Sequence, residues 1–270
     1  MLIQRFLTAL VLVPLSVAAV LLTSSVQFCF FISAVVLVAA WEWAVLLNAP
    51  LWGRLLYALG LGAAMFVMYL HPLLWRPLCF AAVLFWLLAL YWVLQYPKSK
   101  SVWYRPVVVW VLGLCVLLPS WVSLMVLRHD MTHSYWVLYA MSTVWVADTA
   151  AYFLGKAFGR RKLAPVVSPG KSVAGVVGGV VTVIALSVLL SIAIDLEPIV
   201  ALWLTVASGA AALFSVLGDL FESMVKRSVG VKDSGQWLPG HGGILDRVDA
   251  LTSAIPFFTV IYVWFLSGRL

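Results

Sequence analysis

A chain of 270 residues is long enough for one or two soluble domains, but 64% of its residues are hydrophobic and only 10% are charged. Because this small number of charges cannot cover a water-facing surface, the composition excludes an ordinary globular protein. The net charge of +7 would suit a nucleic-acid partner in a soluble protein, whereas in a membrane protein it reflects basic loops on the cytoplasmic side. We therefore expect an all-α polytopic integral membrane protein that binds the lipid bilayer and no nucleic acid.

Apolar runs close to or above the roughly 18 residues that cross a bilayer recur along the whole chain. The first run follows Arg5 as in a signal peptide, but no small-residue cleavage site stands out, so we expect a retained helix. Glu42, which lies between two tryptophans near the end of the second run, fits interfacial snorkelling as well as catalysis. About nine transmembrane helices are predicted, at residues 6–23, 28–47, 54–70, 78–96, 106–127, 134–155, 173–194, 198–218 and 250–268.

Basic residues are distributed unevenly between the two sides that nine spans define. Fourteen lysines and arginines fall on the side of the N-terminus, and three, Arg76, Arg128 and Arg269, fall on the other. The positive-inside rule then places the N-terminus in the cytoplasm and the C-terminus outside it. For a bacterial protein this predicts the inner membrane.

Two long cytoplasmic segments, residues 156–172 and 219–249, stand apart from the short connections, and five of the ten acidic residues lie in the second. Structureless loops of this length are usually functional. We therefore divide the chain into N-terminal transmembrane helices, residues 1–133, and a C-terminal catalytic region, residues 134–270, that contains both loops. Gly155 and Gly159, and Gly175 and Gly179, have the spacing that lets membrane helices approach closely.

The segment 219–249 combines acids, bases and glycines. If the eighth span continues as a helix beyond Gly218, Asp219, Glu222 and Lys226 share one face. Further along, Gly242 and Gly243 precede the last span, where free backbone amides and the positive end of the helix dipole suit a phosphate.

Asp246 and Asp249 lie three residues apart at the start of the last span. Carboxylates beside a phosphate repel it unless a divalent cation intervenes, and Mg²⁺ binds through one or two carboxylates together with substrate phosphates. The pattern therefore predicts Mg²⁺ as cofactor, with room for a second cation.

The motif from Ser223 to Asp249, Ser-x-x-Lys-Arg, four residues, Lys-Asp-x-Gly and later Pro-x-His-Gly-Gly-x-x-Asp-Arg-x-Asp, resembles the signature of the phosphatidate cytidylyltransferases, or CDP-diacylglycerol synthases. The stretches Asp148 to Tyr152 and Ser168 to Gly175 resemble motifs of the same family, although the family often has Lys where Gly170 stands. The resemblance covers about 100 C-terminal residues sharply. It implies a Mg²⁺-dependent nucleotidyltransferase that joins CTP to phosphatidic acid in phospholipid biosynthesis, and a homodimer.

Under this hypothesis the phosphate of phosphatidic acid attacks the α-phosphorus of CTP and displaces pyrophosphate, so catalysis rests on positioning and charge neutralisation. The predicted metal ligands are Asp219, Asp246 and Asp249. Asp219 and Asp246 are also predicted to be catalytic residues. The other predicted catalytic residues are expected to contact phosphate, and they are Lys226, Arg227, Lys232, His241 and Arg247. The predicted substrate-binding residues are Ser168, Lys171, Gly242, Gly243, Asp148 and Tyr152.

Other functions fit the sequence less well. A P-loop would need glycine where Pro165 stands. The Asp-Gly-x-x-Ala-Arg string of the CDP-alcohol phosphotransferases does not occur. A membrane transporter or lipid scramblase, the remaining alternative, would place its ionisable residues at mid-membrane depth, whereas these gather at one face.

Overall fold

The computed structural model describes residues 2–130, 133–235, 237 and 242–269, and within this part of the chain the protein is almost entirely helical. Long apolar helices follow from the solvent, because a backbone in lipid must satisfy its hydrogen bonds within itself. The helices are α1 (Leu2–Leu22), α2 (Ser25–Leu46), α3 (Leu51–Leu70), the short 3-10 helix η1 (Pro72–Leu74), α4 (Trp75–Leu94), α5 (Lys100–Trp103), α6 (Pro106–Asp130), α7 (Ser134–Phe158), α8 (Val173–Ala193), α9 (Pro198–Ser228), α10 (Leu245–Ile261) and the π-helix η2 (Tyr262–Leu266).

The expectation of a polytopic all-α protein is confirmed. Eight helical segments in the described part of the chain are long and apolar enough to cross a membrane, and α1 adds a shorter apolar stretch, Leu10–Leu22. Each of the nine predicted spans coincides with one of α1–α4 or α6–α10, and most ends shift by a few residues. The division of the chain at residue 133 stays a prediction.

The two segments that we expected to be structureless loops are partly ordered, so that expectation is wrong. Within residues 156–172, strands β1 (Lys162–Ala164) and β2 (Ser168–Ser172) form an antiparallel hairpin, which satisfies backbone groups that a loop would expose. Within residues 219–249, α9 continues to Ser228 and α10 starts at Leu245. The helix that we expected to continue past Gly218 does so.

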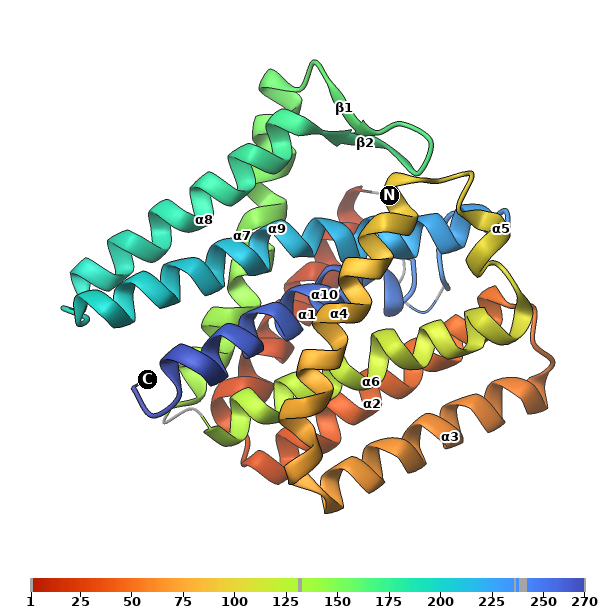
Figure 1. The fold of residues 1–270 in the computed structure, drawn as a ribbon, viewed down its shortest axis with the longest axis horizontal. Coiled ribbons are helices and arrows are strands. Elements are labelled where there is room, and N and C mark those ends of the chain that lie inside the picture. Colours follow the sequence, from red (N-terminus) through yellow and green to blue (C-terminus); the bar gives the residue numbers. More distant parts are fainter. Residues whose placement is uncertain (1, 131–132, 236, 238–241, 270) are drawn as a thin grey trace.

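Helices α9 and α10 run side by side through the body of the molecule, and α10 also contacts α2, α4, α6 and α7 (Figure 1). Gly218 allows the close approach of the pair, because a Cβ there would collide with the backbone of Asp249 and the hydroxyl of Ser253. The two predicted regions thus share one packed body.

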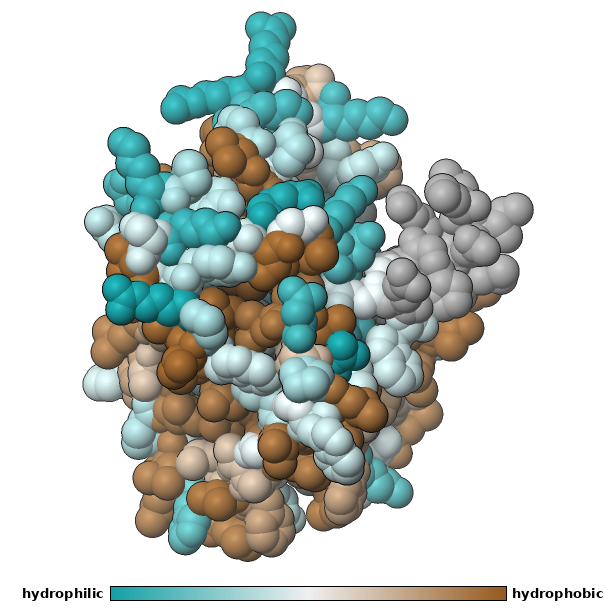
Figure 2. All heavy atoms as spheres, turned by 90° about the vertical axis from the view of Figure 1, so that its right-hand side faces the viewer, coloured by the Kyte–Doolittle hydropathy of each residue, from teal (hydrophilic) through white to brown (hydrophobic). Residues whose placement is uncertain are grey.

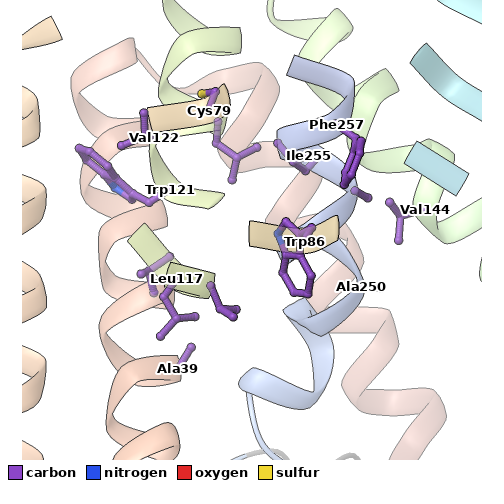
Figure 3. Packing of buried hydrophobic residues seen from close by; sticks show 14 of the residues in the cluster. Ala39, Cys79, Trp86, Leu117, Trp121, Val122, Val144, Ala250, Ile255 and Phe257 are labelled. Atoms are coloured by element: carbon purple, nitrogen blue, oxygen red, sulfur yellow. The ribbon is translucent and has the colours of Figure 1, made fainter. Parts of the chain in front are cut away.

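Buried aromatic and aliphatic side chains fill the space around α10. Trp86 of α4 and Leu117 and Trp121 of α6 are almost fully buried, and they belong to the same cluster of buried side chains as Ile255 and Phe257 of α10 (Figure 3). Within a membrane such packing gains dispersion energy rather than hydrophobic free energy, because lipid tails are as apolar as the side chains.

Helix α8 lies at the edge of the body and packs on α7 and α9. Its contact with α7 is made by small residues: a Cβ at Gly175 would meet the carbonyl of Ala151 at 2.6 Å, and one at Gly179 would meet the carbonyl of Ala147 at 2.7 Å. The glycine spacing noted in the sequence therefore serves a helix pair within one chain.

Candidate active site

Lys226 lies at the centre of a charged cluster where α9 meets the start of α10. Its Nζ lies 2.9 Å from Oε1 of Glu222, one turn earlier on α9, and 2.5 Å from Oδ1 of Asp246 on α10. All three side chains are largely buried, with side-chain exposures between 4% and 9%. The predicted shared face of Glu222 and Lys226 is therefore real, and it is turned toward the protein.

Asp246 also fixes the segment that precedes α10. Its Oδ2 accepts hydrogen bonds from the amides of Ser234, at 2.9 Å, and Gly243, at 2.8 Å. Gly242 has φ +83, and a Cβ there would lie 2.6 Å from Oδ2 of Asp246, so glycine is required on both counts. Both carboxylate oxygens of Asp246 are thus engaged within the protein.

Glu42 of α2 is a site residue that the sequence left undecided. It is 1% exposed, and its Oε1 accepts a hydrogen bond from the amide of Ile244 at 3.0 Å. Its Oε2 accepts from the hydroxyl of Ser234 at 3.0 Å and from the amide of Leu245 at 2.8 Å. Glu42 therefore caps α10 across about 200 residues of sequence, which rules out snorkelling.

One expectation about the start of α10 is wrong. We expected free amides there to suit a phosphate, but the amides of Gly243, Ile244 and Leu245 already donate to Asp246 and Glu42. A helix N-terminus favours any carboxylate, and here the protein supplies its own. A sequence signal existed, because Glu42 lies in an apolar span with no basic residue within four positions.

A second charged group joins the hairpin to α9. Nζ of Lys171, on β2, lies 2.6 Å from Oδ2 of Asp219, and the Ser223 hydroxyl donates to the other oxygen of Asp219 at 3.1 Å. Asp148 of α7 interacts electrostatically with both Lys171 and Asp219. Three segments distant in sequence therefore place charges at one site.

Asp249 links the two charged groups. It interacts electrostatically with Asp219, Lys226 and Lys171, while its Oδ1 accepts a hydrogen bond from the amide of Ala250 at 2.7 Å. Nearby, Oε1 of Glu222 faces Lys226 as an ion pair without hydrogen-bond alignment, and Oε2 is buried without any hydrogen-bond partner.

Acids outnumber bases at this site. Apart from Glu42, whose two oxygens accept hydrogen bonds, five carboxyl groups, those of Asp148, Asp219, Glu222, Asp246 and Asp249, face two lysines and Arg247. A buried negative charge without a matching positive charge destabilises the protein by on the order of several kcal/mol per ion, because the charge loses its hydration. The excess of carboxyl groups is chemically suited to a bound cation.

Mg²⁺ is the cation that the sequence predicts for this site. Among the described residues, no three His, Cys, Asp or Glu side chains come together as a complete metal site. Mg²⁺ needs only one or two carboxylates when substrate phosphates supply the other oxygens. Asp249 fits this requirement, whereas Asp219 would first have to release Lys171 or Ser223, and Asp246 would have to release Lys226 or the two amides.

A cavity of about 480 Å³ reaches the charged site from among the helices. Its walls are largely apolar side chains of α1, α2, α6, α7 and α10, such as Leu12, Phe31, Leu124, Val144 and Ile255. Asp148, Asp246, Arg247 and Asp249 line it as well. The cavity therefore combines apolar walls with a charged end.

The remaining predicted residues lie at varying distances from this cluster. Arg227 and Lys232 are exposed, and Arg227 donates to the carbonyl of Val231 at 3.3 Å. Tyr152 is 64% exposed, and Ser168 starts β2. His241 lies outside the described residues. The roles proposed for these residues stay predictions.

Figure 2 views the side of the molecule where α9 ends, and hydrophilic side chains gather over its upper part with hydrophobic ones below.

Known proteins are similar in sequence to this chain over nearly its whole length. Residues 3–265 match the model of the cytidylyltransferase family. The chain is 43% identical over 262 residues to a phosphatidate cytidylyltransferase of Pseudomonas aeruginosa, which covers 97% of each chain. It is 40% identical over 293 residues to the phosphatidate cytidylyltransferase of Haemophilus influenzae, covering 98% of this chain and all of that relative. The phosphatidate cytidylyltransferase of Bacillus subtilis is 42% identical over 130 residues, about half of each chain.

Proposed function

The chain belongs to the cytidylyltransferase family, and from that premise we propose that it transfers the cytidylyl group of CTP to phosphatidic acid, giving CDP-diacylglycerol and pyrophosphate. The relatives that share nearly its whole length are named for phosphatidate as substrate. The predicted signature residues Asp219, Lys226, Asp246 and Asp249 lie at one site, as this reaction requires. Neither the family nor the site favours a transporter or scramblase.

The observation that carries this proposal is the cavity that ends at the charged cluster. A phosphatidic acid molecule has apolar acyl chains and a phosphomonoester head. The apolar walls on α1, α2 and α6 suit an acyl chain, and the charged end at Arg247 suits the phosphate. CTP would reach the same charges from the water-facing side (Figure 2).

The reaction needs no nucleophile from the protein. An oxygen of the phosphatidic acid phosphate forms a bond to the α-phosphorus of CTP, and the bond from that phosphorus to the bridging oxygen of pyrophosphate breaks. Lys226, Lys171 and Arg247 would neutralise and orient the phosphates, which holds the two reacting groups in line. The ion pairs of these lysines with Glu222, Asp246 and Asp219 keep both cations in place before substrate arrives.

We include Mg²⁺ in the proposal. Asp219 and Asp249 would hold the ion once Asp219 exchanges its contact with Lys171 or Ser223, and Asp246 is a third ligand only if its present hydrogen bonds change. When bound, the ion would supply positive charge that neutralises the phosphates and offsets the excess of carboxyl groups. A second cation is also part of the proposal.

The membrane placement is also part of the proposal. The distribution of lysines and arginines supports an inner-membrane protein with its N-terminus and active site in the cytoplasm. A homodimer is proposed from the family resemblance alone.

The test uses purified full-length protein in detergent with labelled CTP and phosphatidic acid, with Mg²⁺ or with a chelator. We expect labelled CDP-diacylglycerol and pyrophosphate in equal amounts with Mg²⁺ and no product with the chelator. An absence of CDP-lipid under all conditions would refute the reaction. Equal turnover in the chelator would refute only the metal.

A further inference from the structure

A second pocket, of about 380 Å³, lies between the β1–β2 hairpin and helices α4, α8 and α9. We name it the hairpin pocket. Tyr96 is the one lining residue with a polar side chain, and the others are aliphatic residues, Pro165 and Phe214. No lining residue is shared with the cavity that reaches the charged cluster. The hairpin pocket is therefore a separate apolar space.

Exposed apolar side chains form the rim of the hairpin pocket. Leu94, Val166 and Leu213 line it, and they are 73%, 61% and 50% exposed. In contrast, Val167 at the tip of the hairpin is 3% exposed and closes the inner side. Large apolar side chains that are exposed around an apolar hollow mark a site for an apolar ligand.

Two lysines lie close in sequence to lining residues of this pocket, on two different segments of the chain. Lys162 directly precedes the lining residue Leu163, and Lys98 follows Tyr96 by two positions. Both lysines are exposed, and neither side chain forms an ion pair or a hydrogen bond with the residues that the structure describes. The sequence has no acidic residue from 149 to 194, so nothing on the hairpin offsets Lys162, Arg160 and Arg161.

Apolar walls, with exposed lysines close in sequence to the lining residues, match a molecule that has an acyl chain beside a negative phosphate. We propose that the hairpin pocket binds an anionic glycerophospholipid of the surrounding bilayer, with an acyl chain against α4 and α9 and the phosphate near Lys98 and Lys162. The bound lipid is not consumed, because the pocket shares no lining with the catalytic cavity. This site goes beyond the transferase activity and does not depend on it.

Occupancy has a consequence for the active site. The strand that closes the hairpin, β2, carries Lys171, whose partner Asp219 is on α9. A lipid seated between the hairpin and α9 stabilises their relative position and with it the Lys171–Asp219 ion pair. Anionic lipid is therefore expected to raise turnover at a fixed amount of phosphatidic acid.

The test is native mass spectrometry of the full-length protein in detergent, with phosphatidylglycerol and phosphatidylcholine of identical acyl chains added in equal amounts. We expect preferential retention of phosphatidylglycerol. Each lysine near a phosphate contributes on the order of 1 kcal/mol, so the double variant Lys98→Gln/Lys162→Gln should lower retention roughly tenfold or more. The matched control Arg105→Gln/Lys156→Gln removes two exposed charges that are not next to a lining residue of the hairpin pocket, and it should retain phosphatidylglycerol as the wild type does.

A second pair of variants tests the pocket without changing charge. Leu213→Trp places an indole at the pocket rim and should reduce retention, whereas Leu202→Trp, on the same helix and 54% exposed outside the pocket, should not. Equal retention of the two lipids, or unchanged retention in both pocket variants, would overturn the proposal. Retention of phosphatidic acid but not phosphatidylglycerol would also overturn it, because that result assigns the lipid to the catalytic cavity. So would a change of oligomeric state in Leu213→Trp by light scattering, which would make the pocket a contact between copies.

Discussion

Glu42 holds together a segment that the catalytic residues depend on. Its carboxylate accepts from Ser234, Ile244 and Leu245, and the same segment supplies both amides that orient Asp246. Glu42→Gln places an amide donor against at least one N–H donor. A buried polar group left unsatisfied in this way costs about 1–3 kcal/mol. We expect CTP turnover to fall about tenfold or more, measured as kcat and KM on the purified protein.

The control for this prediction is Glu197→Gln, which makes the same chemical change at an exposed position before α9. It should leave turnover unchanged. Ser234→Ala combined with Glu42→Gln should cost less than the sum of the single variants, since both act on one hydrogen bond. Strictly additive effects would argue that Glu42 acts elsewhere.

Variants at Lys226 can distinguish its role in protein stability from its role in catalysis. Lys226→Met leaves Glu222 and Asp246 as buried acids without a cation, and breaking a buried ion pair in this way costs about 3–5 kcal/mol. The double variant Lys226→Met/Glu222→Gln should recover part of the thermal stability but none of the CTP turnover, because the phosphate contact is still missing. Thermal unfolding in detergent and the CTP assay measure the two effects. Recovered turnover in the double variant would remove Lys226 from the proposed chemistry.

At the scale of elements, the close contact between α9 and α10, here called the seam, depends on one glycine, Gly218. Gly218→Ala would drive a methyl group into the backbone of Asp249, so the two helices must separate and Asp249 must move away from Asp219. Overpacking of this kind costs about 1–3 kcal/mol. We therefore expect turnover to fall more than tenfold. Gly60→Ala is the matched control, since nothing lies within 4 Å of a Cβ there, and alanine is the better helix former. Equal activity of both variants would show that the seam adapts.

The elements could be predicted to different degrees. The nine spans and the continuation of α9 follow from hydropathy and from i, i+4 spacing, both of which are local signals. The β1–β2 hairpin could not be predicted in the same way, because strands of three and five residues have too few positions to show alternation. The capped start of α10 was also hidden, since the capping carboxylate comes from α2 rather than from the preceding residues.

At the scale of the whole molecule, the sequence indicates which residues carry charge but not which of them meet. The pairing of Lys226 with Glu222 is local, whereas Lys171 reaches Asp219 across 48 positions and Glu42 reaches Leu245 across 203. Contacts of this kind arise only when helices distant in sequence pack together. Glu42 was therefore recognisable as unusual, but its role required the fold.

The direction of the molecule in the membrane is the last property that the charge distribution predicts. Ser101 lies in the basic region after α4 and Ser267 near the C-terminus, and both are exposed. With the N-terminus in the cytoplasm, Ser101→Cys should react with a membrane-impermeant maleimide only in inside-out vesicles, and Ser267→Cys only in right-side-out ones. The native cysteines Cys29, Cys79 and Cys115 lie within α2, α4 and α6, so wild-type vesicles give the background. Labelling of both positions from the same side would contradict nine crossings, and the reverse pattern would place the charged site, with its excess of carboxyl groups, on the side where CTP is absent.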